Sequence, residues 1–284
     1  MDQELALAIL LSGRSALLTG AAGTGKTYLL NTFIAQARKR GKKVSVTATT
    51  GLAATHLGGN TIHSWSGIGV SDHLPNNFFE RLSKTRRDVI SKTDVLIIDE
   101  ISMLHDFRLD MIDKVLRTVR ENDKPFGGIQ LVMSGDFFQL PPVNRPNEQG
   151  GGFVVYSDAW QELQPAVLYL ERQYRQNDKQ LLEILTALRT GDVRRRHVEA
   201  LLARTEIEPP DGDITELHTV NVDVDDINIQ KLAELPGEER SYQQTTTGSK
   251  IYVENLQRSV LAPENLAIKL GALVMAVKNS PQKL

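Results

Sequence analysis

Short apolar runs alternate with helix-like patterns along the first part of the chain. A near-continuous apolar run of about four to eight residues is typical of a strand buried on both faces of a parallel sheet. Between these runs, apolar residues spaced three and four apart indicate amphipathic helices. The expected strands are residues 16–19, 44–49, 94–98, 129–133 and 167–170. This alternation predicts an α/β fold in which a parallel sheet is flanked by helices.

A second region follows residues 206–213, where two prolines and a glycine give the composition of a domain boundary. After this boundary, the pattern predicts a strand at 214–219, a helix through 224–232, and apolar strands around Ile251 and over 266–277. At roughly 150 residues per domain, the 284 residues are long enough for two domains.

Residues 20–27 read GAAGTGKT and match G-x-x-x-x-G-K-[ST], the phosphate-binding P-loop. The expected strand before this motif and helix after it are the context that a P-loop requires. Backbone N–H groups would point at phosphate oxygens, Lys26 would reach the β and γ phosphates, and Thr27 would offer its hydroxyl to Mg²⁺. The alternative, a glycine-rich turn that binds nothing, is disfavoured by this context. The predicted nucleotide-binding residues are Gly20, Ala21, Ala22, Gly23, Thr24, Gly25, Lys26 and Thr27.

Polar side chains follow two of the later strands. Asp99 and Glu100 come directly after the apolar run 94–98, and Gln139 follows the strand at 129–133. In a chain with a P-loop, an Asp at this place predicts Mg²⁺ coordination and the next Glu predicts orientation of the attacking water. Two solvated acids at a strand end are the alternative. Because ligands gather at the carboxyl edge of such sheets, Gln139 is placed to sense a γ-phosphate.

The stretch 50–69 interleaves small residues and hydroxyls with a histidine and a tryptophan. Backbone N–H groups and hydroxyls suit phosphate contacts, and the indole of Trp65 could stack on an unpaired base. Alternatively, Trp65 anchors a glycine-rich loop to the core. The residues alone leave these two interpretations balanced.

Charge and cysteine content limit other classes of function. The formal net charge is -2, so nucleic-acid binding would need a local groove. There is no cysteine and the six histidines have no metal-binding spacing, so a structural zinc is not expected. No apolar run approaches the ~18 residues of a membrane span, so no membrane partner is expected. The P-loop lies so close to Met1 that no signal peptide fits, which predicts a cytoplasmic protein.

With these motifs in place, the chain resembles the petite-integration-frequency (Pif) family of 5′-to-3′ DNA helicases, which is related to RecD. The resemblance covers nearly the whole chain, and its motifs are more specific than the P-loop alone. The matching segments are 20–27, 49–54, 58–59, 62–64, 98–103, 122–128, 135–143, 174–176 and 188–191.

The resemblance implies two RecA-like domains that bind ATP and Mg²⁺ between them and move along single-stranded DNA. Residues 1–170 match the first RecA-like domain, 171–212 match a small wedge-like subdomain, and 213–284 match the start of the second RecA-like domain. The implied fold class is a RecA-like P-loop NTPase sheet flanked by helices, followed by these two parts.

The resemblance also implies roles for single residues. Gln139 would couple nucleotide state to DNA, and Arg175 would touch the γ-phosphate, so that both act in catalysis with Lys26 and Glu100. Gln3 would read the adenine. The expected DNA contacts are Thr49, Gly51, His63, Ser64, Trp65 and Pro142.

The chain departs from the family at its end, because it stops at Leu284, where the family continues into an inserted subdomain and two further motifs. We therefore expect the N-terminal portion of a helicase, monomeric and weakly active as an ATPase. The alternatives are a nucleotide-gated single-stranded DNA-binding module with little turnover and, with less support, a P-loop phosphotransferase. Residues 137–143 argue against the phosphotransferase, which more often carries a lid of arginines there.

Overall fold

The computed structural model describes residues 1–69, 71–144, 150–175, 178–205, 207, 216–248, 253, 257 and 262–274. The chain divides into two compact units, Met1–Arg194 and Arg195–Leu284. Within the described part of the chain, no helix combines the length and hydrophobicity that crossing a membrane requires.

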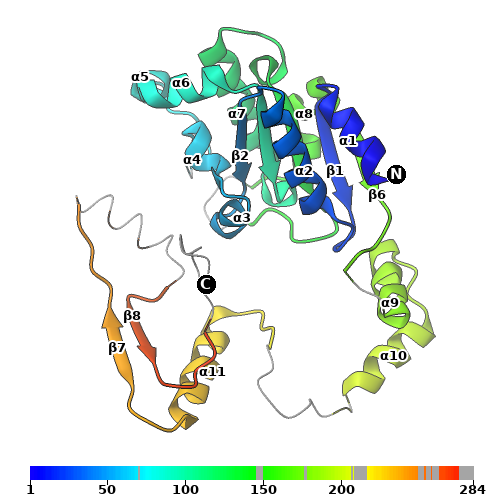
Figure 1. Ribbon diagram of the computed structural model, residues 1–284, viewed down its shortest axis with the longest axis vertical. Helices are drawn as coiled ribbons and strands as arrows, with labels where there is room; N and C mark the ends of the chain where they lie inside the picture. The colour runs from blue at the N-terminus through cyan, green and yellow to red at the C-terminus, as the bar shows by residue number, and fades with distance from the viewer. Residues whose placement is uncertain are drawn as a thin grey trace. The chain divides into compact units, whose positions relative to one another are not determined.

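A six-stranded parallel sheet forms the centre of the first unit (Figure 1). Its strand order is β3-β2-β4-β5-β1-β6. The strands are β1 (Ala16–Gly20), β2 (Val44–Ala48), β3 (Asn60–Thr61), β4 (Val95–Asp99), β5 (Gln130–Gly135) and β6 (Ala166–Leu170). The strands predicted from apolar runs in this unit are all present, which confirms the predicted α/β class. The short edge strand β3 was not predicted, because two residues carry no alternation.

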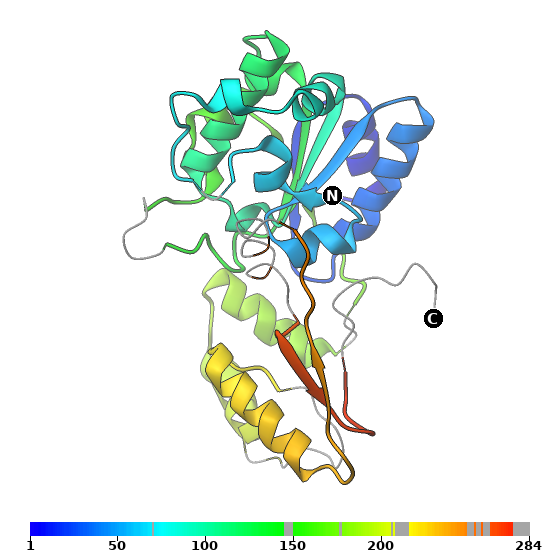
Figure 2. The same cartoon turned by 90° about the vertical axis from the view of Figure 1, so that its left-hand side faces the viewer.

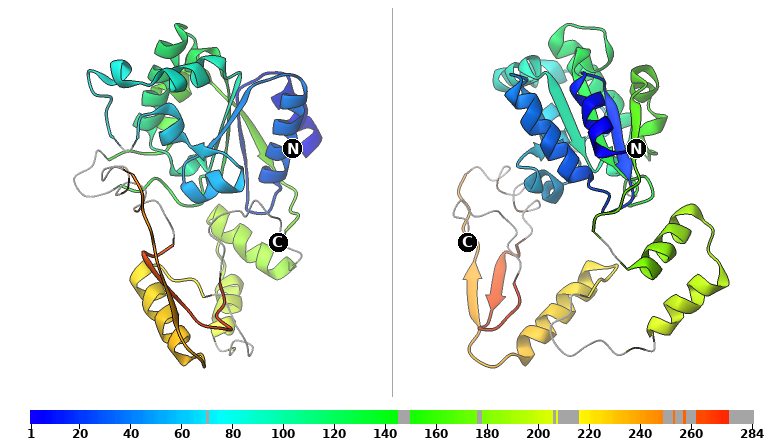
Figure 3. Two further views of the ribbon diagram at one scale, coloured as in Figure 1. Left: turned by 60° about the vertical axis from the view of Figure 1, so that its left-hand side comes forward. Right: turned by 45° about the vertical axis from the view of Figure 1, so that its right-hand side comes forward.

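Helices cover both faces of the sheet. Helices α1 and α2 pack together on one face (Figure 3), and α4 to α8 supply the core on the other. The helices of this unit are α1 (Gln3–Leu11), α2 (Lys26–Lys39), α3 (Gly51–His56), α4 (Ile62–Ser66), α5 (Phe78–Arg81), α6 (Lys84–Lys92), α7 (Asp106–Arg120), α8 (Asp158–Leu163) and α9 (Lys179–Thr190). Short 3-10 turns are η1 (Ile101–Met103), η2 (Pro125–Gly128) and η3 (Val154–Tyr156).

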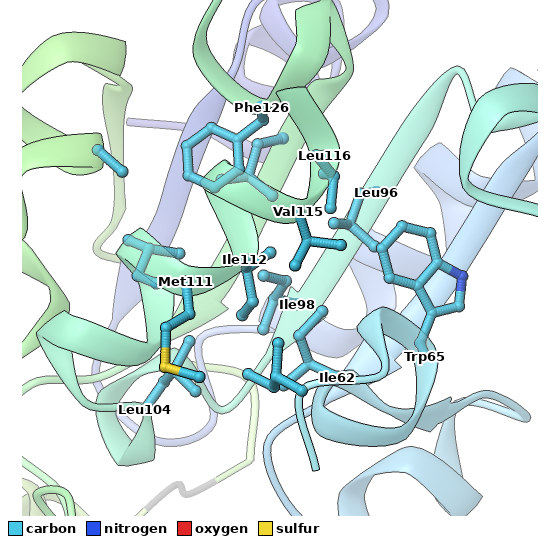
Figure 4. Close-up of a cluster of buried hydrophobic side chains, with 14 of the residues drawn as sticks. Ile62, Trp65, Leu96, Ile98, Leu104, Met111, Ile112, Val115, Leu116 and Phe126 are labelled. Carbon is cyan, nitrogen blue, oxygen red and sulfur yellow. The ribbon is translucent and has the colours of Figure 1, made fainter. Parts of the chain in front are cut away.

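The strands send alternate side chains into two cores, one on each face of the sheet. Ala16 and Leu18 of β1 lie in the core beneath α1 and α2, whereas Leu17 lies in the core beneath α7. In β4, Leu96 and Ile98 enter the α7 core (Figure 4). All five side chains are almost fully buried. Burial on both faces explains why these strands read as continuous apolar runs rather than as alternating ones.

Helix α7 ends at Arg120, and the Pro-Phe-Gly-Gly sequence of η2 forms a tight turn that packs against this helix. Phe126 and Gly127 both have positive φ values, 53° and 61°. A Cβ on Gly127 would lie 2.7 Å from the carbonyl oxygen of Leu116, so this position requires glycine. The Asp113 carboxylate accepts a hydrogen bond from the Phe126 amide and stabilises the turn. Arg120 donates to the carbonyl oxygens of Gly127, Ile90, Ser91 and Thr93.

Among its described residues, the second unit contains two helices and a two-stranded antiparallel ribbon (Figure 2). These elements are α10 (Arg195–Thr205), α11 (Asn221–Glu234), β7 (Arg240–Gln243) and β8 (Asn265–Ile268). The prediction of a strand at 214–219 is wrong for residues 216–219, which form no strand, and 214–215 lie outside the described residues. The strand expected around Ile251 lies outside them too. The strand β8 covers only the beginning of the one expected over 266–277.

The Arg120→Ala substitution is expected to lower the free energy of unfolding by about 1–3 kcal/mol, because it leaves part-buried carbonyl oxygens without their donor. Denaturant unfolding followed by circular dichroism measures this change. The control is Lys114→Ala, which removes an exposed cation from the same helix and should change stability by no more than ~0.5 kcal/mol. Equal effects of the two substitutions would contradict a bridging role for Arg120.

Candidate nucleotide site and nucleic-acid interface

The P-loop connects the end of β1 to the start of α2, as the motif requires. Gly23 and Gly25 have φ values of 84° and 82°, in the left-handed region that favours glycine. A Cβ on Gly25 would lie 2.3 Å from the side-chain nitrogen of Gln3, and one on Gly23 would lie 2.6 Å from the side-chain oxygen of Gln173. The glycines therefore let two flanking segments close on the loop while its N–H groups stay at the N-terminus of α2.

Gln3 and Arg175 lie on opposite flanks of this loop. From the first turn of α1, Gln3 Nε2 donates to the Thr24 carbonyl oxygen at 3.3 Å. On the other flank, the Tyr174 amide donates to the Gly23 carbonyl oxygen at 2.9 Å. Arg175 follows directly, with its Cβ against Gly23 and its side chain exposed. Both residues are thus next to the P-loop, and their contacts with adenine and γ-phosphate stay predictions.

The ammonium group of Lys26 lies inside the P-loop. Its Nζ donates to the carbonyl oxygens of Gly20 at 2.7 Å and Ala21 at 3.1 Å. Burial lowers the pKa of Lys26, and the charges of nearby carboxylates, chiefly Asp136 and Glu100, oppose this effect. These carbonyl oxygens are neutral acceptors. The ammonium group would form stronger, charge-assisted hydrogen bonds with an anion such as a phosphate.

Two acids lie at the carboxyl end of β4. Glu100 has a positive φ of 53°, which is uncommon for a residue with a side chain and marks a constrained turn. Burial raises the pKa of both Asp99 and Glu100, and the charge of Asp99 raises that of Glu100 further. A nearby cation would relieve this repulsion, so the pair is suited to hold Mg²⁺ and a polarised water.

A cavity of about 510 Å³ lies beside these acids within the first unit. It brings Thr27 from α2 together with Asp99, Glu100 and Gln139. Among the described residues, no three histidine, aspartate or glutamate side chains converge on a metal site. A hydroxyl and one carboxylate nevertheless fit Mg²⁺, which usually keeps several waters and binds substrate phosphates. Thr27 and Asp99 are therefore the residues that would hold the ion.

The sensor loop, residues 136–139, follows β5 and reaches the same cavity. Asp136 is only 2% exposed, and its carboxylate accepts from the Phe138 amide at 3.2 Å and from Gln139 Nε2 at 3.1 Å. The same carboxylate forms an ion pair with Arg189 at 2.6 Å. No role for Asp136 or Arg189 could be predicted from the sequence, because an Asp within a motif and an Arg on a helix give no signal that they meet.

The expected DNA-binding residues are distributed over α3, α4 and the loop after the sensor. Thr49 Oγ1 donates to the Glu100 carbonyl oxygen at 2.9 Å, so the loop before α3 is tied to the acidic end of β4. Gly51 and Ser64 are exposed, which leaves them accessible to a DNA strand. Pro142 is buried, so its placement does not support the expected contact with DNA.

Trp65 is buried rather than presented to solvent. Its ring lies in the α7 core near Leu96 and Ile62, and the residue is 8% exposed (Figure 4). Stacking on a base requires an open ring face, so the expected role of Trp65 in DNA binding is corrected to that of a core anchor. The sequence left both interpretations open, because an indole in a polar loop has the same pattern in either case.

His63 is part of α4, and Arg108 Nη1 of α7 lies 3.3 Å from its Nε2. A guanidinium can only donate, so Nε2 accepts and the neutral ring carries its proton on Nδ1. Burial, together with the charges of Arg108 and His105, lowers the pKa of His63 to about 4. Asp72 holds Arg108 through an ion pair at 3.1 Å. His63 is therefore a neutral donor, positioned by an arginine that the sequence analysis did not single out.

The chain is similar in sequence and in structure to known DNA helicases. The sequence model of the PIF1-like helicase family matches residues 2–194. The ATP-dependent DNA helicase Pif1 of Psychrobacter is 44% identical, over 99% of this chain and 44% of the relative. The ATP-dependent DNA helicase RRM3 of Saccharomyces cerevisiae is 36% identical, over 99% of this chain and 40% of the relative. The chain thus spans less than half the length of these relatives.

Solved structures of Pif1 helicases share the fold. The Pif1 helicase of Candida albicans superposes with a TM-score of 0.83 at 35% identity, covering 95% of this chain and 63% of that one. The Bacteroides Pif1 bound to single-stranded DNA superposes with a TM-score of 0.75 at 30% identity, covering 96% and 64%. These similarities establish the RecA-like character of the sheet.

The Trp65→Ala substitution is expected to destabilise the protein by about 3–5 kcal/mol, because it removes a buried indole from the core. Thermal or denaturant unfolding measures this loss. Single-stranded DNA affinity, measured on the folded fraction, should be unchanged. A variant of normal stability with weakened DNA binding would restore the base-stacking role.

The low pKa of His63 predicts that its ring stays neutral throughout the range from pH 6 to pH 8. A group with a pKa of about 4 changes charge near pH 4, well below this range, whereas an unperturbed histidine would titrate near 6.5. Proton NMR of the histidine rings tests this, with His63→Asn identifying the resonance. A His63 signal that titrates between pH 6 and 7 would contradict the burial and the arginine contact described above.

Proposed function

Because this chain belongs to the PIF1-like helicase family, we propose that it forms the ATP-binding part of a DNA helicase that moves 5′-to-3′ along single-stranded DNA. The observation that carries the proposal is the convergence of phosphate, metal and sensor residues on one edge of the sheet. The P-loop, Asp99, Glu100 and Gln139 all come from that edge.

The nucleotide would bind with its phosphates over the P-loop. Lys26 would exchange the carbonyl oxygens of its own loop for phosphate oxygens, a stronger charge-assisted interaction. Thr27 and Asp99 would hold Mg²⁺, and Glu100 would orient the attacking water. Arg175 would then neutralise the γ-phosphate, which the docking of its segment on Gly23 supports.

Single-stranded DNA would lie across α3 and α4. The Nδ1–H of His63 and the exposed hydroxyl of Ser64 are neutral donors suited to phosphate oxygens. The coupling between this surface and the nucleotide has a short structural route. Thr49, at the start of the DNA-facing stretch, bonds to the backbone of Glu100, so a change at the attacking-water position would reach the DNA loop.

The domain division stays part of the proposal. Residues 1–170 would be the first RecA-like domain, 171–212 a wedge-like subdomain, and 213–284 the start of a second RecA-like domain. The sheet of the first unit supports the first assignment. The antiparallel ribbon of the second unit does not by itself identify a RecA-like sheet.

The experiment for the nucleotide site is Lys26→Ala. Loss of the ammonium should weaken binding of a fluorescent ATP analogue with Mg²⁺ at least about tenfold, because a charge-assisted contact to phosphate contributes about 1.5–3 kcal/mol. The circular dichroism spectrum should stay that of the wild type. The control is Lys39→Ala, an exposed lysine on the same helix. Tight nucleotide binding by a folded Lys26→Ala variant would contradict the site.

The DNA surface predicts a shallow salt dependence. The logarithm of affinity should fall against the logarithm of salt concentration with a slope of roughly -0.7 for each neutralised phosphate. Neutral donors displace few counterions, so the total slope should be small. Combined His63→Ala and Ser64→Ala substitutions should weaken binding for all base sequences alike. His73→Ala with Ser91→Ala, exposed residues of the same two types, is the control. A sequence-dependent loss, or none, would place the DNA elsewhere.

A further inference from the structure

One carboxylate organises the whole sensor loop. Asp136 accepts from the Phe138 amide and from the Gln139 side chain, and its own carbonyl oxygen accepts from the Gln139 amide at 2.9 Å. Asp136 itself is 2% exposed, so its carboxylate is largely shielded from bulk water. Asp136 therefore holds the backbone of Gln139 through its carbonyl oxygen and the side chain through its carboxylate, which fixes the direction in which that side chain points.

Arg189 reaches this loop from helix α9 and contacts it twice. Its Nη1 is 2.6 Å from Asp136 Oδ2, the oxygen that also accepts from Gln139. Its guanidinium carbon lies 4.3 Å from the centroid of the Phe138 ring, a cation–π contact. The ion pair and the stacked ring together define the position of the arginine along the loop. A lysine, whose ammonium is a compact point charge, would not be held in this way.

The pair is also part of the charge balance of the nucleotide site. Burial would raise the pKa of Asp136, but bonds from Arg189, the Phe138 amide and Gln139 outweigh it and the pKa is lowered. Asp136 in turn is the strongest carboxylate acting on the P-loop lysine, Lys26. Without Arg189, the buried carboxylate would lose its charged partner, and its hold on the Gln139 side chain would weaken.

Helix α9 has a second connection to the site. It begins at Lys179, shortly after the segment whose Tyr174 and Gln173 bond to the P-loop. In the chain, the same helix therefore follows a segment that is bonded to the phosphate-binding loop and, near its end, is ion-paired to the sensor loop. A shift of α9 would act on both.

From these contacts we propose that Arg189 is a positioning residue that sets Gln139 in its γ-phosphate-sensing orientation and links the position of α9 to that sensor. The proposal rests on the proposed function, because it assumes that Gln139 responds to bound ATP. Under this proposal, nucleotide-dependent DNA binding also depends on Arg189, a residue that lies outside the sheet.

The experiment measures the ratio of single-stranded DNA affinities with two nucleotides. A fluorescent oligodeoxythymidine strand is titrated against the full 284-residue chain with Mg²⁺ and either ADP or a non-hydrolysable ATP analogue. The wild-type ratio is expected to be about fivefold or more, the usual lower range for coupled sites. The Arg189→Ala ratio is expected to lie within about twofold of one, while its nucleotide affinity stays within about threefold of wild type.

Three variants separate positioning from simple stabilisation. Arg117→Ala removes another part-buried arginine–aspartate pair, to Asp113 on α7, and should keep the wild-type ratio. Arg189→Lys keeps the charge but loses the planar contact with Phe138, so its ratio should be intermediate; it also serves if Arg189→Ala does not fold. The double variant Arg189→Ala with Gln139→Ala should match Gln139→Ala alone, since both substitutions remove the same link.

The outcomes distinguish this proposal from the one it rests on. A wild-type protein with no DNA binding, or with a ratio near one, would overturn the proposed function. A wild-type ratio of about five or more that persists in folded Arg189→Ala would overturn only the positioning role. Equal losses of the ratio in Arg189→Ala and Arg117→Ala would overturn it as well, by showing that general loosening of the fold is enough.

Discussion

The parallel register of the central strands is the constraint on which the site depends. Pairing of Ala48 with Asp99, and of Thr19 with Gly135, brings the carboxyl ends of β2, β4, β1 and β5 to one edge. Each strand then continues into a segment that carries chemistry. The glycines of the P-loop, the two acids, the sensor loop and the loop before α3 therefore meet, although the P-loop and the sensor loop lie more than a hundred residues apart in the sequence. Both hydrophobic cores serve to hold this register.

At that edge, electrostatic interactions connect the P-loop, the two acids after β4 and the sensor loop. A half-buried ammonium, Lys26, lies among the carboxylates of Asp99, Glu100 and Asp136, and Arg189 compensates the last of these. Burial raises the pKa of Asp99 and Glu100 and lowers that of Lys26, so each group is under pressure to lose its charge. Phosphates and Mg²⁺ would relieve both pressures together, which explains why a nucleotide with its metal suits this site.

Much of this arrangement could be predicted from sequence, for a physical reason. Buried parallel strands produce apolar runs, and a P-loop needs fixed residues at fixed spacing, so the sheet and the positions of Lys26 and Asp99 follow from local pattern. The burial of Trp65 and the contact of Arg108 with His63 could not be predicted, since they depend on packing between distant helices. The ion pair of Arg189 depends on tertiary contact in the same way, and the polar strand β7 has no apolar signal at all.

We propose that ATP and single-stranded DNA act on each other through this one sheet edge. The most direct measurement is the rate of ATP hydrolysis by the 284-residue chain with Mg²⁺, in the presence and absence of a single-stranded oligonucleotide. DNA is expected to raise the rate several-fold. A chain that binds ATP through Lys26 but hydrolyses it at the same rate with and without DNA would show that the two sites are not coupled.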